Sequence, residues 1–167
     1  SAVAQAIGAQ ASHRSRQVVA LAGDGGLAMM LGDLLTLRQL KLPVKIVVFN
    51  NSSLAFVELE MKAAGIVNYG TNLDNPNLAD IAKAAGLHGT RVEYPNDLEA
   101  ALRTAFATPG PALVEVIVNR QELSMPPSIT FGQAKGFSLW AAKSVLSGRG
   151  DEVLDLAKTN VLQRILS

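Results

Sequence analysis

The tetrapeptide Gly23-Asp24-Gly25-Gly26 constrains the fold of this chain most. A helical pattern and then a β-pattern follow it, and the β-pattern ends at Asn50-Asn51. Asp24 and Asn51 are 27 positions apart (51 minus 24), about the length of one helix and one strand. Two parallel strands joined by such a crossover end at the same edge of their sheet. The spacing therefore predicts a carboxylate and an amide oxygen side by side over a glycine-opened helix start, which suits a divalent cation that holds a diphosphate.

Composition narrows the class of protein. The 167 residues are 49% hydrophobic and 17% charged, which is typical of a globular domain. The net charge of +1, without dense Lys/Arg clusters, argues against nucleic acid as a partner. The sequence has no cysteine, which excludes disulfides and thiolate metal sites and is compatible with a reducing cytoplasm. We expect neither a transmembrane nor a signal segment, and we expect a fragment of a longer chain because Ser1 opens directly into a helical pattern.

Short apolar runs alternate with helical patterns along most of the chain. Asn77 and Asn96 are predicted helix caps, and the last helix is predicted to be amphipathic. The alternation predicts an α/β fold with a doubly wound, mainly parallel sheet, helices on both faces and a C-terminal helical tail. We predict an α/β domain at 1–123 and a linker (124–128) with the tail at 124–167. The predicted strands are 17–22, 44–49, 90–93 and 112–118, and the predicted helices are 2–11, 27–40, 54–62, 78–85, 97–107, 133–146 and 151–166.

Taken alone, Asp24-Gly25 is more often a turn that caps a helix, and Asn50-Asn51 a turn after a strand. Together, at this spacing, they resemble the thiamine diphosphate enzymes, whose cofactor motif is Gly-Asp-Gly, some two dozen residues and then Asn-Asn. The resemblance implies that Asp24 and Asn51 bind Mg²⁺ through side-chain oxygens and Ser53 through its backbone carbonyl. It implies a thiamine diphosphate site formed by Gly23, Asp24, Gly25, Gly26, Asn51 and Ser53.

The resemblance also assigns roles to the predicted helix 54–62. Phe56 matches an aromatic residue between the thiazolium and a flavin, Val57 an adjacent apolar pocket wall, and Glu60 an acid on the substrate side. These three are the candidate catalytic residues. The alternatives are that Phe56 and Val57 are ordinary core residues of an amphipathic helix, and that Glu60 is a solvated carboxylate.

Further segments are similar to one branch, the pyruvate:quinone oxidoreductases: 42–52, 134–139, 147–153 and 157–160. Similarity over essentially the whole chain implies the diphosphate-binding domain of a homo-oligomeric flavoenzyme that converts pyruvate to acetate and CO2. The flavin, FAD, would be bound mainly by a domain absent from this chain. Since the glutamate that activates the cofactor also lies on an absent domain of a partner subunit, we expect the fragment to be inactive alone.

Residues 132–167 hold five Lys/Arg and three acids, a net charge of +2 on a mildly basic amphipathic tail. Such a helix can lie in a bilayer interface. The resemblance implies contact with membrane lipid and quinone, and a cytoplasmic enzyme peripheral on the inner face of the cell membrane. The alternative for the tail is packing on a partner subunit.

Three other functions are alternatives to this interpretation. Another thiamine diphosphate enzyme, such as an acetolactate synthase or a decarboxylase, would use the same motif, although the tail argues against it. A non-catalytic module for membrane anchoring or dimerisation would use only the tail. A nicotinamide-binding domain is disfavoured, since no Gly-x-Gly-x-x-Gly follows a strand.

Overall fold

The computed structural model describes residues 2–120 and 130–166, with side chains as far as residue 159. The chain forms two compact units, one of residues 1–52 and 74–118 and the other of residues 53–73 and 119–167. Residues 53–73 thus belong with the C-terminal helices rather than with the sheet. The predicted division at 123/124 stays a prediction, and the predicted linker at 124–128 lies outside the described residues.

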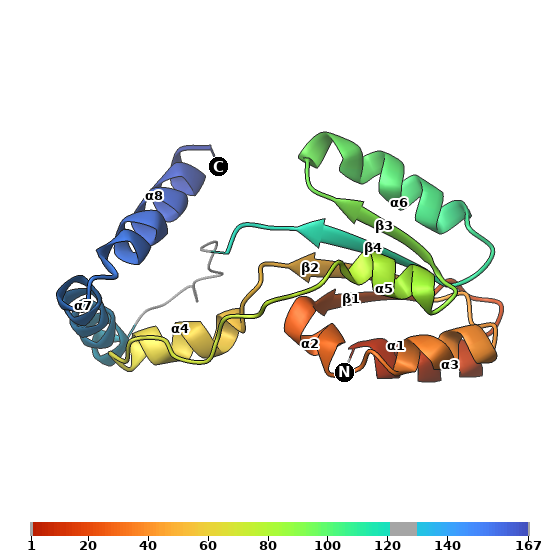
Figure 1. The fold of residues 1–167 in the computed structure, drawn as a ribbon, viewed down its shortest axis with the longest axis horizontal. Coiled ribbons are helices and arrows are strands. Elements are labelled where there is room, and N and C mark those ends of the chain that lie inside the picture. The colour runs from red at the N-terminus through yellow and green to blue at the C-terminus, as the bar shows by residue number, and fades with distance from the viewer. Residues whose placement is uncertain (1, 121–129, 167) are drawn as a thin grey trace. The chain divides into compact units, whose positions relative to one another are not determined.

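The first unit is built on a four-stranded sheet (Figure 1). Its strands lie in the order β1-β2-β4-β3, and every pair is parallel. The run Val-Lys-Ile-Val-Val-Phe explains why β2 lies inside the sheet, because β-branched residues suit a strand covered on both sides. The strands are β1 (Val19–Gly23), β2 (Lys45–Asn50), β3 (His88–Val92) and β4 (Ala112–Ile117).

Helices cover both faces of this sheet. Helices α1 (Ala2–Ser12), α3 (Asp33–Gln39) and α5 (Leu78–Ala84) contribute to one apolar core, in which Leu34, Leu37 and Leu78 are almost fully buried. Helix α6 (Leu98–Ala107) packs through Ala101 and Ala105 in a second, smaller core. The predicted α/β fold with a parallel sheet and helices on both faces is confirmed.

Two local predictions in this unit are wrong. The predicted helix 27–40 is instead two helices, α2 (Asp24–Ala28) and α3. Tighter turns separate them, for example the turn closed by the hydrogen bond from Asp33 N to Met30 O. Gly32 falls in this break, where its low helix propensity favours the interruption. The side chain of Asn96 does not cap a helix; it lies in a 3-10 turn, η1 (Pro95–Asp97), that leads into α6.

The second unit is helical and contains α4 (Ala55–Ala63), α7 (Phe131–Leu146) and α8 (Gly150–Leu166). The predicted helical tail is thus confirmed. A Thr130/Gln133 capping box begins α7, and Gly136 brings α7 against α4, since a Cβ there would lie 1.7 Å from the Ala63 carbonyl oxygen. Among the described helices, none is both long and apolar enough to cross a membrane.

Candidate functional site

The predicted cation site begins at the carboxyl ends of β1 and β2. Gly23 pairs with Phe49 in the sheet. The residues that follow them, Asp24 and Asn50, therefore lie at the same edge. Asp24 is the first residue of α2, and only 3% of its surface is exposed. The structure therefore places a nearly buried carboxylate at the rim where the motif spacing predicts one.

Asn75, which precedes α5, joins the two motif halves. Its Nδ2 donates to Asp24 Oδ2 at 2.6 Å and to Asn50 Oδ1 at 3.0 Å. Both oxygens thus lie within 3.0 Å of one nitrogen and face a common point. The Asp24 carboxylate is a hard oxygen donor of the kind that Mg²⁺ prefers, so this side chain fits that ion. The predicted ligand Asn51 directly follows Asn50 in the chain, and its contact with a cation stays a prediction.

Asn50 is held in one orientation. Its Nδ2 donates to Glu115 Oε1 at 2.7 Å, and its Oδ1 accepts from the backbone N–H of Ser52 at 3.0 Å. Ser52 has a φ of 55°, in the left-handed region that a non-glycine residue adopts only when its surroundings hold it there. The Asn50 side chain therefore fixes the turn that carries Asn51 away from the strand.

Glu115 lies in the middle of β4 and is completely buried. Besides Asn50, it accepts from Arg91 Nη1 on Oε1 and from the Ala79 N–H on Oε2, both at 3.1 Å. The Arg91 side chain is 31% exposed, so the balancing positive charge reaches solvent. The buried Glu115 carboxylate of the first unit thus accepts hydrogen bonds from three donors.

Helix α4 of the second unit carries the three candidate catalytic residues, and all three point into solvent. Phe56 is 77% and Val57 47% exposed, and Glu60 is also exposed. The alternative that Phe56 and Val57 are core residues of this chain is therefore wrong. Their contact with a cofactor, and the position of Glu60 beside a substrate, stay predictions.

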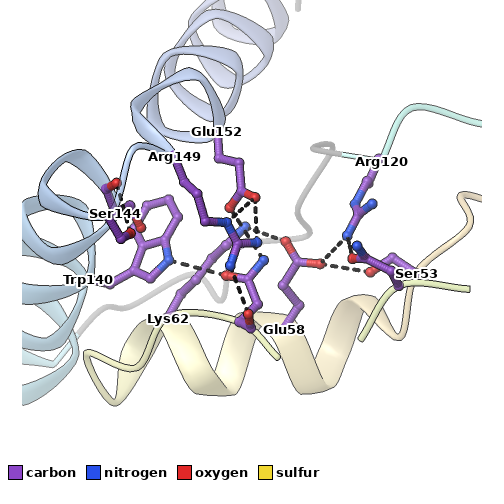
Figure 2. A network of polar contacts seen from close by, with 11 residues as sticks. Ser53, Glu58, Lys62, Arg120, Trp140, Ser144, Arg149 and Glu152 are labelled. Carbon is purple, nitrogen blue, oxygen red and sulfur yellow. Dashed lines mark hydrogen bonds and ion pairs between the residues drawn. The ribbon is translucent and has the colours of Figure 1, made fainter. Parts of the chain in front are cut away.

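The same helix buries two charged side chains instead, Glu58 and Lys62. Glu58 Oε1 accepts from Lys62 Nζ at 2.7 Å, and its Oε2 accepts from Ser53 Oγ at 2.7 Å and Arg120 Nη2 at 3.3 Å (Figure 2). Burial alone would raise the pKa of the Glu58 carboxyl, but hydrogen bonds from Lys62 and Ser53 and the nearby positive charges lower it overall. Glu58 is therefore a buried carboxylate in its charged form.

This network extends to the C-terminal helices (Figure 2). Lys62 Nζ lies 4.9 Å from the centre of the Trp140 ring, and Trp140 Nε1 donates to Asn68 Oδ1 at 3.3 Å. Arg149 donates to the Asn68 carbonyl at 2.9 Å and pairs with Glu152. Ser53, the predicted third magnesium ligand, is thus tied by its hydroxyl to this network, while the role of its carbonyl stays a prediction.

Sequence reasoning missed Asn75, Glu115 and the pair Glu58–Lys62. The i, i+4 spacing of Glu58 and Lys62 was a detectable signal for an ion pair, although not for its burial. A single acid within the apolar run 112–118 was a signal for a buried polar contact at Glu115. Asn75 lies in a polar loop and left no comparable signal.

Comparison with known proteins gives this site a context. The profile of the C-terminal thiamine pyrophosphate-binding domain of thiamine pyrophosphate enzymes matches residues 1–116. The protein YdaP of Bacillus subtilis (strain 168), named by inference as thiamine pyrophosphate-containing, is 36% identical over 154 residues, which cover 92% of this chain and 27% of YdaP. Acetolactate synthase 2 of Nicotiana tabacum is 37% identical over 130 residues, which cover 72% of this chain and 20% of the synthase.

Among solved structures, the thiamine diphosphate-dependent 4-hydroxybenzoylformate decarboxylase of Rhodococcus jostii RHA1 superposes with a TM-score of 0.65 and 30% sequence identity. The superposition covers 68% of this chain and 22% of the decarboxylase. The chain therefore spans between a fifth and about a quarter of the length of these relatives. With the profile matched over more than half of its residues, the chain belongs to the thiamine pyrophosphate enzyme family, as a C-terminal thiamine pyrophosphate-binding domain.

Proposed function

We propose that this chain binds Mg²⁺ and thiamine diphosphate at the carboxyl ends of β1 and β2, as one domain of a longer, homo-oligomeric enzyme. The observation that carries the proposal is the nearly buried carboxylate of Asp24, which shares one amide donor, Asn75, with Asn50. Among the residues that the structure describes, no cationic side chain pairs with Asp24, and a buried acid of this kind at a strand end is suited to a cation. Membership in a thiamine pyrophosphate-binding family supports the identity of the diphosphate.

Each motif residue has a role in this proposal. The Asp24 carboxylate and the Asn51 side-chain oxygen would hold Mg²⁺, with the Ser53 carbonyl as the third ligand that the motif implies, and the amides of Gly25 and Gly26 would donate to the diphosphate. A Cβ at Gly23 or Gly26 would meet no other described segment of the chain within 4 Å, so this backbone has open space beside it. Bound thiamine diphosphate supplies a ring that stabilises the carbanion formed when a 2-oxo acid loses CO2.

For the reaction of the longer enzyme, we favour pyruvate as substrate and a reaction of the acetolactate synthase type. Acetolactate synthases of a plant, a bacterium, red algae and a yeast recur among the relatives, at 32–37% identity over 72% of this chain. They support another thiamine diphosphate enzyme better than a flavin-linked one. In this reaction Phe56, Val57 and Glu60 would face substrate or cofactor from α4.

The second candidate is flavin-linked oxidation of pyruvate to acetate, with FAD on another domain and quinone as electron acceptor. One observation favours it: the similarity to YdaP covers 92% of the chain, whereas the similarity to the acetolactate synthases covers 72%. The C-terminal helices thus have a counterpart in YdaP. In this case α8 would bind membrane lipid at the inner face of the cell membrane.

Calorimetry tests the binding proposal. We expect this chain to bind thiamine diphosphate only with Mg²⁺ present and Asp24→Ala to lose that binding. Asp80→Ala, which removes an exposed carboxylate from the first turn of α5, serves as the matched control and should bind normally. Unchanged affinity of Asp24→Ala would refute the motif assignment.

Product analysis on the longer protein separates the two reactions. Acetolactate from pyruvate, without reduction of an added quinone, supports the first candidate, and acetate with quinone reduction supports the second. Flotation with anionic vesicles tests the membrane role, which fails if a protein truncated before Asp151 floats equally well. We expect the 167-residue chain alone to decarboxylate no pyruvate.

A further inference from the structure

We infer that Glu115 is a positioning residue for the magnesium and diphosphate site, acting through Asn50. This inference rests on the proposed function, which names neither residue as a ligand. Glu115 is completely buried in β4, where a charged side chain needs strong partners. One of those partners is the side chain of Asn50, the residue before the predicted ligand Asn51.

The first step concerns the orientation of the Asn50 amide. Glu115 Oε1 accepts from Asn50 Nδ2, so this contact selects the NH2 end of the amide and directs Oδ1 toward the rim. On the rim, Oδ1 meets two donors, the Ser52 N–H and Asn75 Nδ2. A flipped amide would bring its NH2 group against those two donors.

The second step concerns the backbone. The bond from Ser52 N–H to Asn50 Oδ1 closes a turn in which Ser52 has a φ of 55°. This turn sets the direction in which Asn51 leaves β2. Because the turn depends on Oδ1 facing the rim, Glu115 controls the placement of Asn51 without touching it.

The third step concerns Asp24. Asn75 donates through the same nitrogen to Asp24 and to Asn50, so the orientation of Asn50 also sets where Asn75 meets the Asp24 carboxylate. The Glu115 carboxylate is therefore linked to both halves of the motif through the side-chain amides of Asn50 and Asn75. Residues that hydrogen-bond to metal ligands commonly affect the metal affinity of a site in this way.

Glu115 itself is fixed from three directions. Oε1 accepts from Asn50 and Arg91, and Oε2 accepts from the Ala79 N–H in the first turn of α5. These donors come from β2, β3 and α5, so rotation of the carboxylate would break a bond to another element. The rigidity of Glu115 is what allows it to hold the amide of Asn50.

Glu115→Gln tests this inference on the 167-residue chain, with Mg²⁺ and thiamine diphosphate as the probes. Glutamine offers one oxygen where two are needed, so either Ala79 loses its acceptor or Asn50 and Arg91 both lose theirs. We expect the magnesium-dependent affinity to fall by about 10- to 100-fold, as for partners behind other metal ligands. Val114→Ala, on the opposite face of the same strand, is the control: it should lower the melting temperature but leave the affinity within about twofold, because loss of packing acts on stability.

Exchanging the donor and the acceptor distinguishes a positioning role of Glu115 from a general loss of stability. Asn50→Asp alone places a second carboxylate against Glu115 and should abolish binding. Asn50→Asp combined with Glu115→Gln restores one donor and one acceptor between positions 50 and 115 with their roles exchanged, and it leaves an acceptor oxygen on the rim. Arg91 loses its bond to position 115 in this variant but keeps Glu93 as a partner. We expect the double variant to regain at least about a tenfold higher affinity than Asn50→Asp, in line with the contribution of such partners.

The outcomes are distinct. Wild-type affinity in Glu115→Gln, with binding lost in Asp24→Ala, would overturn the inference and leave the proposed function standing. Wild-type affinity in both variants, or no binding by the unaltered chain, would overturn the proposed function and the inference with it. If Glu115→Gln does not fold, Glu115→Asp, which keeps the charge but withdraws it by one methylene, must show the loss of affinity instead.

Discussion

Among the described residues, each unit contains a buried glutamate with three donors, and the charge of the two glutamates is balanced differently. Glu115 in the first unit receives bonds from Asn50, from the Ala79 N–H and from Arg91, which lie on three different elements. Glu58 in the second unit receives its shortest ion-pair contact from Lys62 on its own helix. One carboxylate joins distant segments, and the other is neutralised locally.

The difference in exposure of the cations has energetic consequences. The Lys62 side chain is 0% exposed, whereas that of Arg91 is 31% exposed. If Lys62 is removed, the more distant Arg120 is the cation that remains near the buried Glu58 charge among the residues with described side chains. If Arg91 is removed, two donors remain on Glu115, and water can enter the space of the lost side chain. We therefore expect the second unit to be more sensitive to loss of its cation.

The largest effect is predicted for Lys62→Met. It leaves a buried charge largely uncompensated and removes the cation from the Trp140 ring, so the free energy of unfolding should fall by about 3–5 kcal/mol. Trp140 is the single tryptophan of the chain, so its fluorescence during urea denaturation reports on the second unit. Lys62→Met combined with Glu58→Leu should recover most of this loss; a single variant as stable as the wild type would contradict the prediction.

A smaller effect is predicted for Arg91→Gln in the first unit. Losing one charged donor of a buried carboxylate should lower the free energy of unfolding by about 1–3 kcal/mol. Far-ultraviolet circular dichroism during denaturation measures it, because this unit holds the whole sheet. Glu93→Gln removes the exposed second partner of Arg91 and should change stability little. A loss larger than that of Lys62→Met would reverse the proposed contrast.

The pH dependence of stability should also distinguish the units. The folded-state pKa of Glu58 lies below its ordinary value of 4.5, so the unfolded state binds more protons as pH falls through this range. The stability that Glu58 contributes is therefore complete above about pH 4.5 and is lost as pH falls through the lower, folded-state pKa. Tryptophan-monitored denaturation of the wild type and Glu58→Gln should show a difference that narrows below that pH. A constant difference would contradict the assignment.

The sequence predicted the parallel α/β fold and the helical tail, because periodicity and glycine breaks act locally. Motif spacing predicted that Asp24 and Asn51 lie at one edge of the sheet. The register brings Asp24 to the edge where β2 ends at Asn50, while a meeting of Asp24 with Asn51 stays a prediction. The partner that faces Asp24 was not predictable. Asn75 lies 51 residues away along the chain and arrives there only through the packing of α5.

Burial of charge was the second failure of prediction from sequence. An apolar stripe on 54–62 suggested that Phe56 and Val57 could face a core, but α4 turns Glu58 and Lys62 inward. The reason is tertiary: Trp140, Ser53 and Arg120 surround these two side chains and satisfy them. No helical periodicity contains that information, because the partners belong to other segments.

The smallest predicted effect completes the comparison. Lys83 and Asp80 form an i, i+3 pair on α5 with an N–O distance of 2.9 Å, close to that of Glu58 and Lys62, but their side chains are 57% and 61% exposed. Solvent screens such a pair, so Lys83→Ala should lower the free energy of unfolding by no more than about 0.5 kcal/mol. Urea denaturation in low and high salt measures it. If Lys83→Ala were as damaging as Lys62→Met, short spacing rather than burial would set the strength of ion pairs here, and the contrast between the two glutamates would lose its basis.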